Sequence, residues 1–180
     1  MRTLFLKNIL FPAIEKESNG RIKIDAYWNG ALSISYDALK KVSKGDTIDI
    51  TTVVPEYAAK ELPITQLFKS FLVGPSGKKQ VSAFRKMYAS IPELANELNQ
   101  SNIEPIFLST GYSVGFFSRE KMGSLSDLKN QKWRTASFWH RDYLKNYGAI
   151  PVTIPWGEQV YKAFANKSLD GLMVNIRPLS

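Results

Sequence analysis

Two stretches of this sequence repeat one pattern, in which an amphipathic helix is followed by a short turn containing lysine and then by a strand. The stretches are DALKKVSKGDTIDITTV at 37–53 and EQVYKAFANKSLDGLMV at 158–174. Each places an apolar residue before an aspartate at the start of its strand. Alternation of helices and strands is typical of a parallel sheet, so the repeat predicts two related α/β lobes. The alternative is that two helix–turn–strand units are alike by chance.

The rest of the chain continues this alternation. Apolar periodicity predicts helices over the first 18 residues, about 35–44, most of 62–100, 138–147 and 156–166. Strands are expected at 21–27, 47–54, 103–109, 111–118, 150–154 and 169–174, with a further strand ending at Arg134. A capped helical turn is expected between Ser124 and Asp127. We expect the first lobe to span residues 1–110 and the second lobe residues 111–180.

The charge of the chain is positive but evenly spread. The net charge is +8, yet basic residues occur as scattered pairs among acidic ones, and no zinc-finger, RNA-recognition or basic-zipper spacing is present. The sequence therefore predicts no nucleic-acid partner, and a solvated basic surface or a field that favours small anions is expected instead. The absence of cysteine excludes disulfides and thiolate metal sites and is compatible with either redox compartment.

Residue patterns that carry catalysis are absent from the sequence. His140 is the only histidine, and there is no cysteine or G-x-S-x-G motif to indicate a nucleophile with its base. The HExxH, EF-hand, GxGxxG and P-loop motifs are also missing. The sequence therefore predicts a protein that is not an enzyme and that has neither a metal site nor a cofactor.

Arg134 is the strongest candidate for a binding residue. It ends a predicted strand, and ligands of open parallel sheets bind beyond the carboxyl ends of the strands. Its guanidinium is always charged and matches a carboxylate with two parallel hydrogen bonds. Thr135 and Ser137 are expected to add hydroxyl donors, and the amides of the next helix a positive potential. The alternative is a surface arginine that pairs with any nearby acid.

Four ordered blocks of the sequence together resemble one family, the solute-binding proteins of tripartite ATP-independent periplasmic (TRAP) transporters, of the dicarboxylate-binding (DctP) type. The blocks are SNGRIKIDAYWNGAL (18–32), ALKKVSKGDTIDITTVVPEYAAKELP (38–63), SLSDLKNQKWRTAS (124–137) and GAIPVTIPWGEQVYKAFANKSLDGLMVN (148–175). The resemblance implies an α/β fold of the type II periplasmic-binding-protein class, with two lobes and mixed or parallel sheets. It also implies a small organic anion as ligand and a TRAP membrane permease as partner.

The resemblance assigns roles to several residues. In this family the arginine of the block similar to KWRT forms a salt bridge with the ligand carboxylate, which implies that role for Arg134. Trp156 and Glu158 match the Pro-Trp-x-Glu start of a family helix, with a structural or a ligand-facing role left open. Glu56 and Tyr57 follow the second expected strand, where the first lobe faces the cleft, and both are candidate contacts.

Further candidate ligand contacts lie near the motifs of the resemblance or among the aromatic residues. Ser137 follows the arginine block, and Asn175 follows the Asp-Gly turn formed by Asp170 and Gly171; both are candidate ligand contacts. Trp139, with Trp156 and Tyr57, would stack on an aromatic or sugar-like ligand, or else only pack in the protein.

Two positions depart from the family pattern. Many relatives carry a second arginine where this chain has Val114, and many have Glu-Asn after the Asp-Gly turn, where this chain has Leu172 and Met173. We therefore expect a pocket with one polar anchor fewer.

The length of the chain also differs from that of the family. Relatives begin with a signal peptide and a first strand and continue beyond the Asp-Gly strand, so this chain is expected to be a fragment that is incomplete at both ends. No signal peptide is expected in the opening segment, which Lys7, Asn8 and Pro12 interrupt. The full-length protein is expected to be periplasmic and monomeric. The alternatives are a ligand-sensing domain of a regulator and a non-functional fragment.

Overall fold

The computed structural model describes residues 2–69, 74–75, 77–108 and 114–175. The chain divides into two compact units, Met1–Leu32 and Ser33–Ser180, and each is described by itself. No helix in the described part of the chain has both the length and the apolar character needed to cross a membrane.

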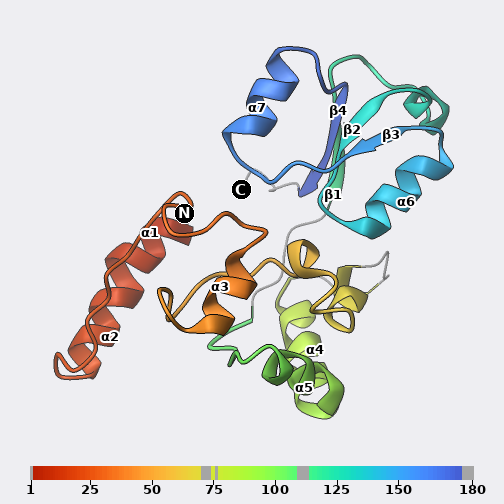
Figure 1. Ribbon diagram of the computed structural model, residues 1–180. Helices are drawn as coiled ribbons and strands as arrows, with labels where there is room; N and C mark the ends of the chain where they lie inside the picture. The colour runs from red at the N-terminus through yellow and green to blue at the C-terminus, as the bar shows by residue number, and fades with distance from the viewer. Residues whose placement is uncertain (1, 70–73, 76, 109–113, 176–180) are drawn as a thin grey trace. The chain divides into compact units, whose positions relative to one another are not determined.

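The first unit is a helix followed by an extended segment that returns along it. The helix comprises α1 (Arg2–Phe5), the π-helical turn η1 (Leu6–Leu10) and α2 (Phe11–Glu17) (Figure 1). Gly20, with a φ of 72°, follows the helix and donates its N–H to the Glu15 carbonyl, as expected for a C-terminal glycine. The strand expected at 21–27 is not formed. The Ile24 N–H instead donates to the Glu15 carboxylate at 3.3 Å, because no strand in the described residues pairs with this segment.

The first part of the second unit is helical. It contains α3 (Ala38–Lys44), the 3₁₀ turns η2 (Pro55–Ala58) and η3 (Thr65–Lys69), and the longer helices α4 (Gly77–Ser90) and α5 (Pro92–Gln100). Leu39, Ala58, Leu62 and Leu98 form its apolar core. The strand expected at 47–54 is absent, as is any strand in the described residues of 103–109, because a strand forms only beside a partner and no described strand pairs with them.

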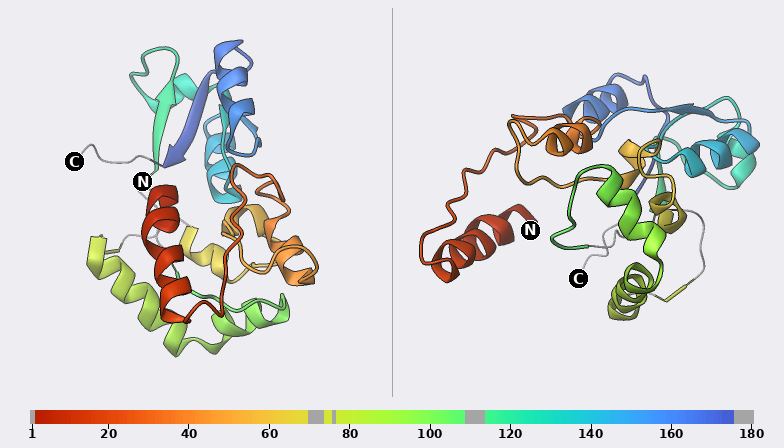
Figure 2. Two further views of the ribbon diagram at one scale, coloured as in Figure 1. Left: turned by 90° about the vertical axis from the view of Figure 1, so that its left-hand side faces the viewer. Right: turned by 60° about the horizontal axis from the view of Figure 1, so that its bottom comes forward.

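The second part of this unit contains a mixed four-stranded sheet in the order β1-β4-β2-β3. The strands are β1 (Val114–Ser118), β2 (Lys132–Arg134), β3 (Ile150–Val152) and β4 (Gly171–Asn175). β2 is parallel to both β3 and β4. β1 is antiparallel to β4, as Figure 2 shows in its left view. The 3₁₀ turn η4 (Leu125–Leu128) precedes β2, and α6 (Phe138–Asn146) and α7 (Glu158–Ala165) lie on opposite sides of the sheet (Figure 1). These strands and helices were predicted from the sequence, and the structure confirms them.

Trp133 is the centre of the apolar core on the α6 side of the sheet. Its side chain is 0% exposed and packs with Leu128, Leu144 and Met173. Gly171 lies beside it in β4, and a Cβ at this position would come within 2.5 Å of the indole ring. A glycine is therefore needed here for close packing, which gives the Asp-Gly turn a structural role.

The expected division into lobes at residue 110 stays a prediction. Every strand of the sheet lies after residue 113, and the described residues before 109 contain none.

Asp127 accepts backbone hydrogen bonds in the turn before β2, and we expect its carboxylate to make the folding stability depend on pH. The N–H groups of Gly123 and Ser124 donate to its carboxylate at 2.7 and 3.0 Å, and these bonds hold the pKa of Asp127 below its ordinary value of 3.8. A lowered pKa stabilises the folded state fully above the ordinary value, and this contribution is lost as the pH falls through the folded pKa. We expect Asp127→Asn to flatten the decrease in stability below about pH 5, as measured by urea unfolding at several pH values. An unchanged pH profile would contradict this role, and Asp142→Asn, at an exposed carboxylate, is the control.

Candidate functional site

The candidate site is built around Arg134, the last residue of β2. β2 lies inside the sheet between β4 and β3, with both of which it runs parallel, so Arg134 lies at the carboxyl edge where ligands of such sheets bind. Side chains alternate along a strand, and Arg134 therefore lies on the face opposite to the Trp133 core. The arginine is only 4% exposed.

Neutral oxygens accept the hydrogen bonds of the Arg134 guanidinium. Nε donates to the Ile154 carbonyl in the loop after β3 at 2.9 Å, and Nη2 donates to the Tyr57 hydroxyl at 3.2 Å. No described residue accepts a hydrogen bond from Nη1, and no described carboxylate forms an ion pair with Arg134. The buried positive charge is thus held in place by neutral oxygens, and no carboxylate among the described residues neutralises it.

Tyr57 connects this arginine to an earlier part of the chain. Pro55 begins the η2 turn that carries Tyr57, and the buried Gln66 side chain holds the turn by donating to the Pro55 carbonyl at 2.7 Å. The Tyr57 hydroxyl accepts a second hydrogen bond, at 3.4 Å, from the backbone N–H of Trp156. One phenol oxygen therefore joins η2 to the arginine and to the segment before α7.

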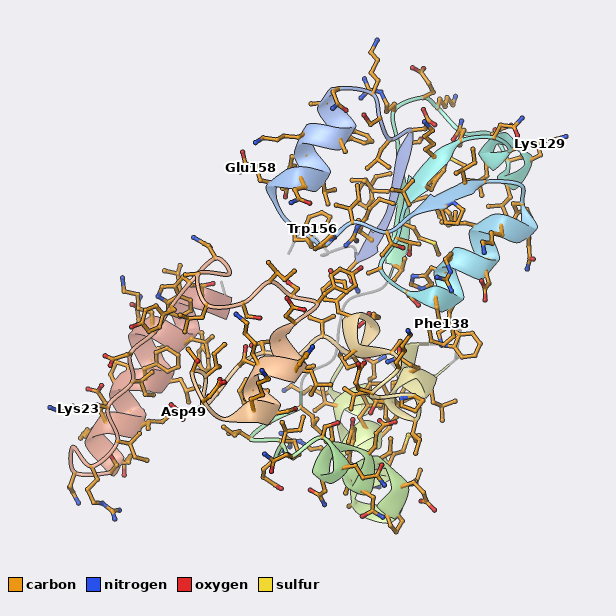
Figure 3. The ribbon with its side chains drawn as sticks, in the orientation of Figure 1. Lys23, Asp49, Lys129, Phe138, Trp156 and Glu158 are labelled. Atoms are coloured by element: carbon orange, nitrogen blue, oxygen red, sulfur yellow. The ribbon has the colours of Figure 1, made fainter. Side chains whose placement is uncertain are left out.

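Trp156 lies against the charged group. The centroid of its ring is 5.4 Å from the Arg134 Cζ, which is a cation–π contact, and the residue is 46% exposed. Figure 3 labels Trp156 just before α7 and Glu158 at the start of that helix. Glu158 forms an exposed ion pair with Lys162 at 2.8 Å, which favours a role in the helix over contact with a ligand.

The other residues predicted for the site have different surroundings. Ser137 is buried at the start of α6, and neither its Oγ nor the Thr135 Oγ1 has a hydrogen-bond partner among the described residues. Glu56 precedes Tyr57 in η2. Asn175 ends β4 opposite Val114 of β1. The structure brings Tyr57 and Trp156 together with Arg134, whereas no hydrogen bond between described residues joins Ser137, Glu56 or Asn175 to the guanidinium.

Trp139 and Asp170 have structural contacts. The Trp139 indole N–H donates to the Gln66 carbonyl at 3.2 Å, and its ring packs on Phe138 with centroids 4.7 Å apart. The Asp170 carboxylate accepts the Lys132 N–H at 2.7 Å at the start of β2. These contacts favour a packing role for Trp139 and a role for Asp170 in ordering the start of β2.

Two members of the cluster of residues around the Arg134 guanidinium were not predicted from the sequence. The Ile154 carbonyl is a backbone group, so its residue type carries no signal. The ring of Tyr36 packs on Tyr57 with centroids 4.4 Å apart, and only the fold brings these two residues together. Within the described ranges, no group of three or more histidine, aspartate or glutamate side chains is arranged to hold a metal ion.

Solved structures of solute-binding proteins share this fold. A TRAP periplasmic solute-binding protein of Roseobacter denitrificans with bound β-D-glucuronate matches 97% of this chain with a TM-score of 0.81 at 17% identity. A TRAP periplasmic solute-binding protein of a Sulfitobacter species with bound β-D-galacturonate matches 92% with a TM-score of 0.78 at 16% identity. An extracytoplasmic solute receptor of Bordetella pertussis that binds pyroglutamic acid matches 95% with a TM-score of 0.76 at 24% identity. The expected α/β fold with a mixed sheet is confirmed.

The chain spans little more than half the length of these proteins, covering 57%, 54% and 56% of them in the same order. No curated protein matches it in sequence. The family described as bacterial extracellular solute-binding protein, family 7 (DctP), matches residues 8–178, which is nearly the whole chain. The resemblance recognised in the four sequence blocks is thereby confirmed, and the chain belongs to family 7 of the bacterial extracellular solute-binding proteins.

Proposed function

We propose that this protein is the solute-binding subunit of a TRAP transporter and that it binds a small organic acid through Arg134. The observation that carries the proposal is the buried guanidinium, which has only neutral acceptors among the described residues. Burial of an uncompensated charge is costly, because the charge loses its hydration. A ligand carboxylate removes this cost by supplying the missing negative charge in a geometry that matches the guanidinium fork.

The ligands of several similar structures agree with this chemistry. The proteins with bound β-D-glucuronate and β-D-galacturonate and the receptor for pyroglutamic acid all contain organic acids, and a further neighbour from Rhodoferax ferrireducens contains malonate. These ligands differ in size and shape and have a carboxylate in common. We therefore propose a carboxylate ligand for this chain. The other residues of the pocket select the size and shape of the rest of that ligand.

The proposal extends to location, partner and activity. We propose that this protein, as a member of an extracellular solute-binding family, acts outside the cytoplasm, passes its ligand to membrane permease subunits and is not an enzyme. We propose that this protein does so as a monomer. Size-exclusion chromatography with light scattering tests the oligomeric state.

Titration calorimetry of the purified chain against a panel of organic acids, each paired with its neutral amide, tests the proposed function. We expect at least one acid to bind and its amide to bind far more weakly, since the amide lacks the charge that Arg134 requires. Binding should also raise the melting temperature, because a ligand present at a hundred times its Kd stabilises the folded state by about 2.7 kcal/mol. A chain that binds no acid, or that binds acids and amides equally, would contradict the proposal.

A further inference from the structure

The hydroxyl group of Tyr36 is a buried polar group without an assigned role. Its oxygen is shielded from solvent and has no hydrogen-bond partner among the described residues. The Tyr36 ring packs on the Tyr57 ring with centroids 4.4 Å apart and planes tilted by 37°. A tyrosine that only packs usually turns its hydroxyl to water or to a partner, so a buried and unpaired hydroxyl requires an explanation.

The O–H group of Tyr57 also donates no hydrogen bond to a described residue. Its oxygen accepts hydrogen bonds from Arg134 Nη2 and from the Trp156 N–H, and no described residue accepts a hydrogen bond from its own O–H. A phenol can donate one hydrogen bond as well as accept. Two phenol donors thus belong to the cluster that holds the guanidinium.

The electrostatics of the cluster keep Tyr36 protonated. Burial, and secondarily the neighbouring Tyr57, raise the pKa of Tyr36 above its ordinary value of 10.0, while the charge of Arg134 acts in the opposite direction. Tyr57 links Tyr36 to the guanidinium, because its ring packs on Tyr36 and its hydroxyl accepts a hydrogen bond from Arg134 Nη2. At neutral pH the hydroxyl therefore offers a proton to an acceptor.

We propose that Tyr36 is a specificity-determining residue of the Arg134 site, whose hydroxyl binds an oxygen substituent that the ligand carries near its carboxylate. The ligand class is then a hydroxy or oxo carboxylate rather than the corresponding unsubstituted acid. This inference rests on the proposed function, since it needs a carboxylate at Arg134. A site built to hydrogen-bond a ligand oxygen discriminates against an analogue that lacks it, because the buried group is then left unpaired.

The test compares acids that differ by one oxygen substituent. Lactate and propionate, malate and succinate, and mandelate and phenylacetate are titrated into the unmodified chain and into Tyr36→Phe. The substitution keeps the ring that packs on Tyr57 and removes only the hydroxyl. We expect the unmodified chain to bind the oxygenated member of a pair about tenfold more tightly, and Tyr36→Phe to lose most of this preference. The affinity for the unsubstituted member should not change.

A matched variant controls for the loss of a tyrosine hydroxyl in general, and a melting curve of each variant checks that it is folded. Tyr27→Phe makes the same chemical change at a residue that is 62% exposed, and it should leave every affinity unchanged. Equal weakening of both members of a pair, no effect of Tyr36→Phe, or a best ligand without an oxygen substituent would overturn the inference while Arg134-dependent binding persists. Failure of every acid to bind would instead overturn the proposed function.

Discussion

Replacing Arg134 by alanine is expected to weaken the binding of the organic acid by roughly thirty-fold to several thousand-fold. The substitution leaves the ligand carboxylate desolvated and unpaired, which costs about 2–5 kcal/mol of binding free energy. Titration calorimetry with the acid that binds the unmodified chain most tightly measures the loss. The folding stability of the unliganded chain should change little, because removing a buried charge that no described carboxylate neutralises offsets the loss of its hydrogen bonds to the Ile154 carbonyl and the Tyr57 hydroxyl.

Two further variants separate the role of the guanidinium from that of positive charge in general. Arg134→Lys should recover only part of the affinity, since an ammonium keeps the charge but not the planar fork. Arg141→Ala removes an exposed arginine of α6 and should leave binding unchanged. If Arg134→Ala binds normally, or if it loses binding only because it no longer folds, Arg134 is a structural residue and the proposed site is wrong.

Trp133→Ala is expected to lower the free energy of unfolding by about 3–5 kcal/mol, as the loss of a fully buried tryptophan does in other protein cores. The side chain is 0% exposed in the core on the α6 side of the sheet, and its indole N–H donates to the Gln131 side chain at 2.9 Å. Its removal leaves a cavity that Gly171, which has no side chain, cannot fill. Urea unfolding followed by circular dichroism measures the change.

Trp139→Ala is the matched control for this stability effect. Trp139 is 36% exposed, so its loss creates less cavity and should cost clearly less than the loss of Trp133. If the two substitutions lowered the free energy of unfolding equally, burial of Trp133 in the core on the α6 side of the sheet would not explain its contribution to stability.

The sequence was sufficient to predict the helices and turns that are stabilised by local interactions. The helices follow apolar periodicity, and Ser124 and Asp127 form the expected capping box of η4. Strands depend on partners that are distant in the sequence. The strands that pair with one another after residue 113 were predicted correctly, whereas alternation at 21–27 and 47–54 suggested strands that have no described neighbour with which to pair.

The same distinction applies to the site. The position of Arg134 follows from its place at the end of a strand, and the family resemblance pointed to Tyr57 and Trp156. Tyr36 has no signal of its own in the sequence, because its relevance depends on a ring contact with Tyr57, which in turn contacts Arg134. Such a role arises only when separate segments of the chain fold together.

The two edges of the sheet differ in their resistance to aggregation. β3 forms one edge, and its middle residue is Pro151, which has no N–H to offer to an incoming strand. β1 forms the other edge of the described sheet; it contains no proline, and its Phe116 and Phe117 are exposed. Unwanted self-association of this chain through strand pairing would therefore begin at β1, and a proline or lysine introduced there would suppress it.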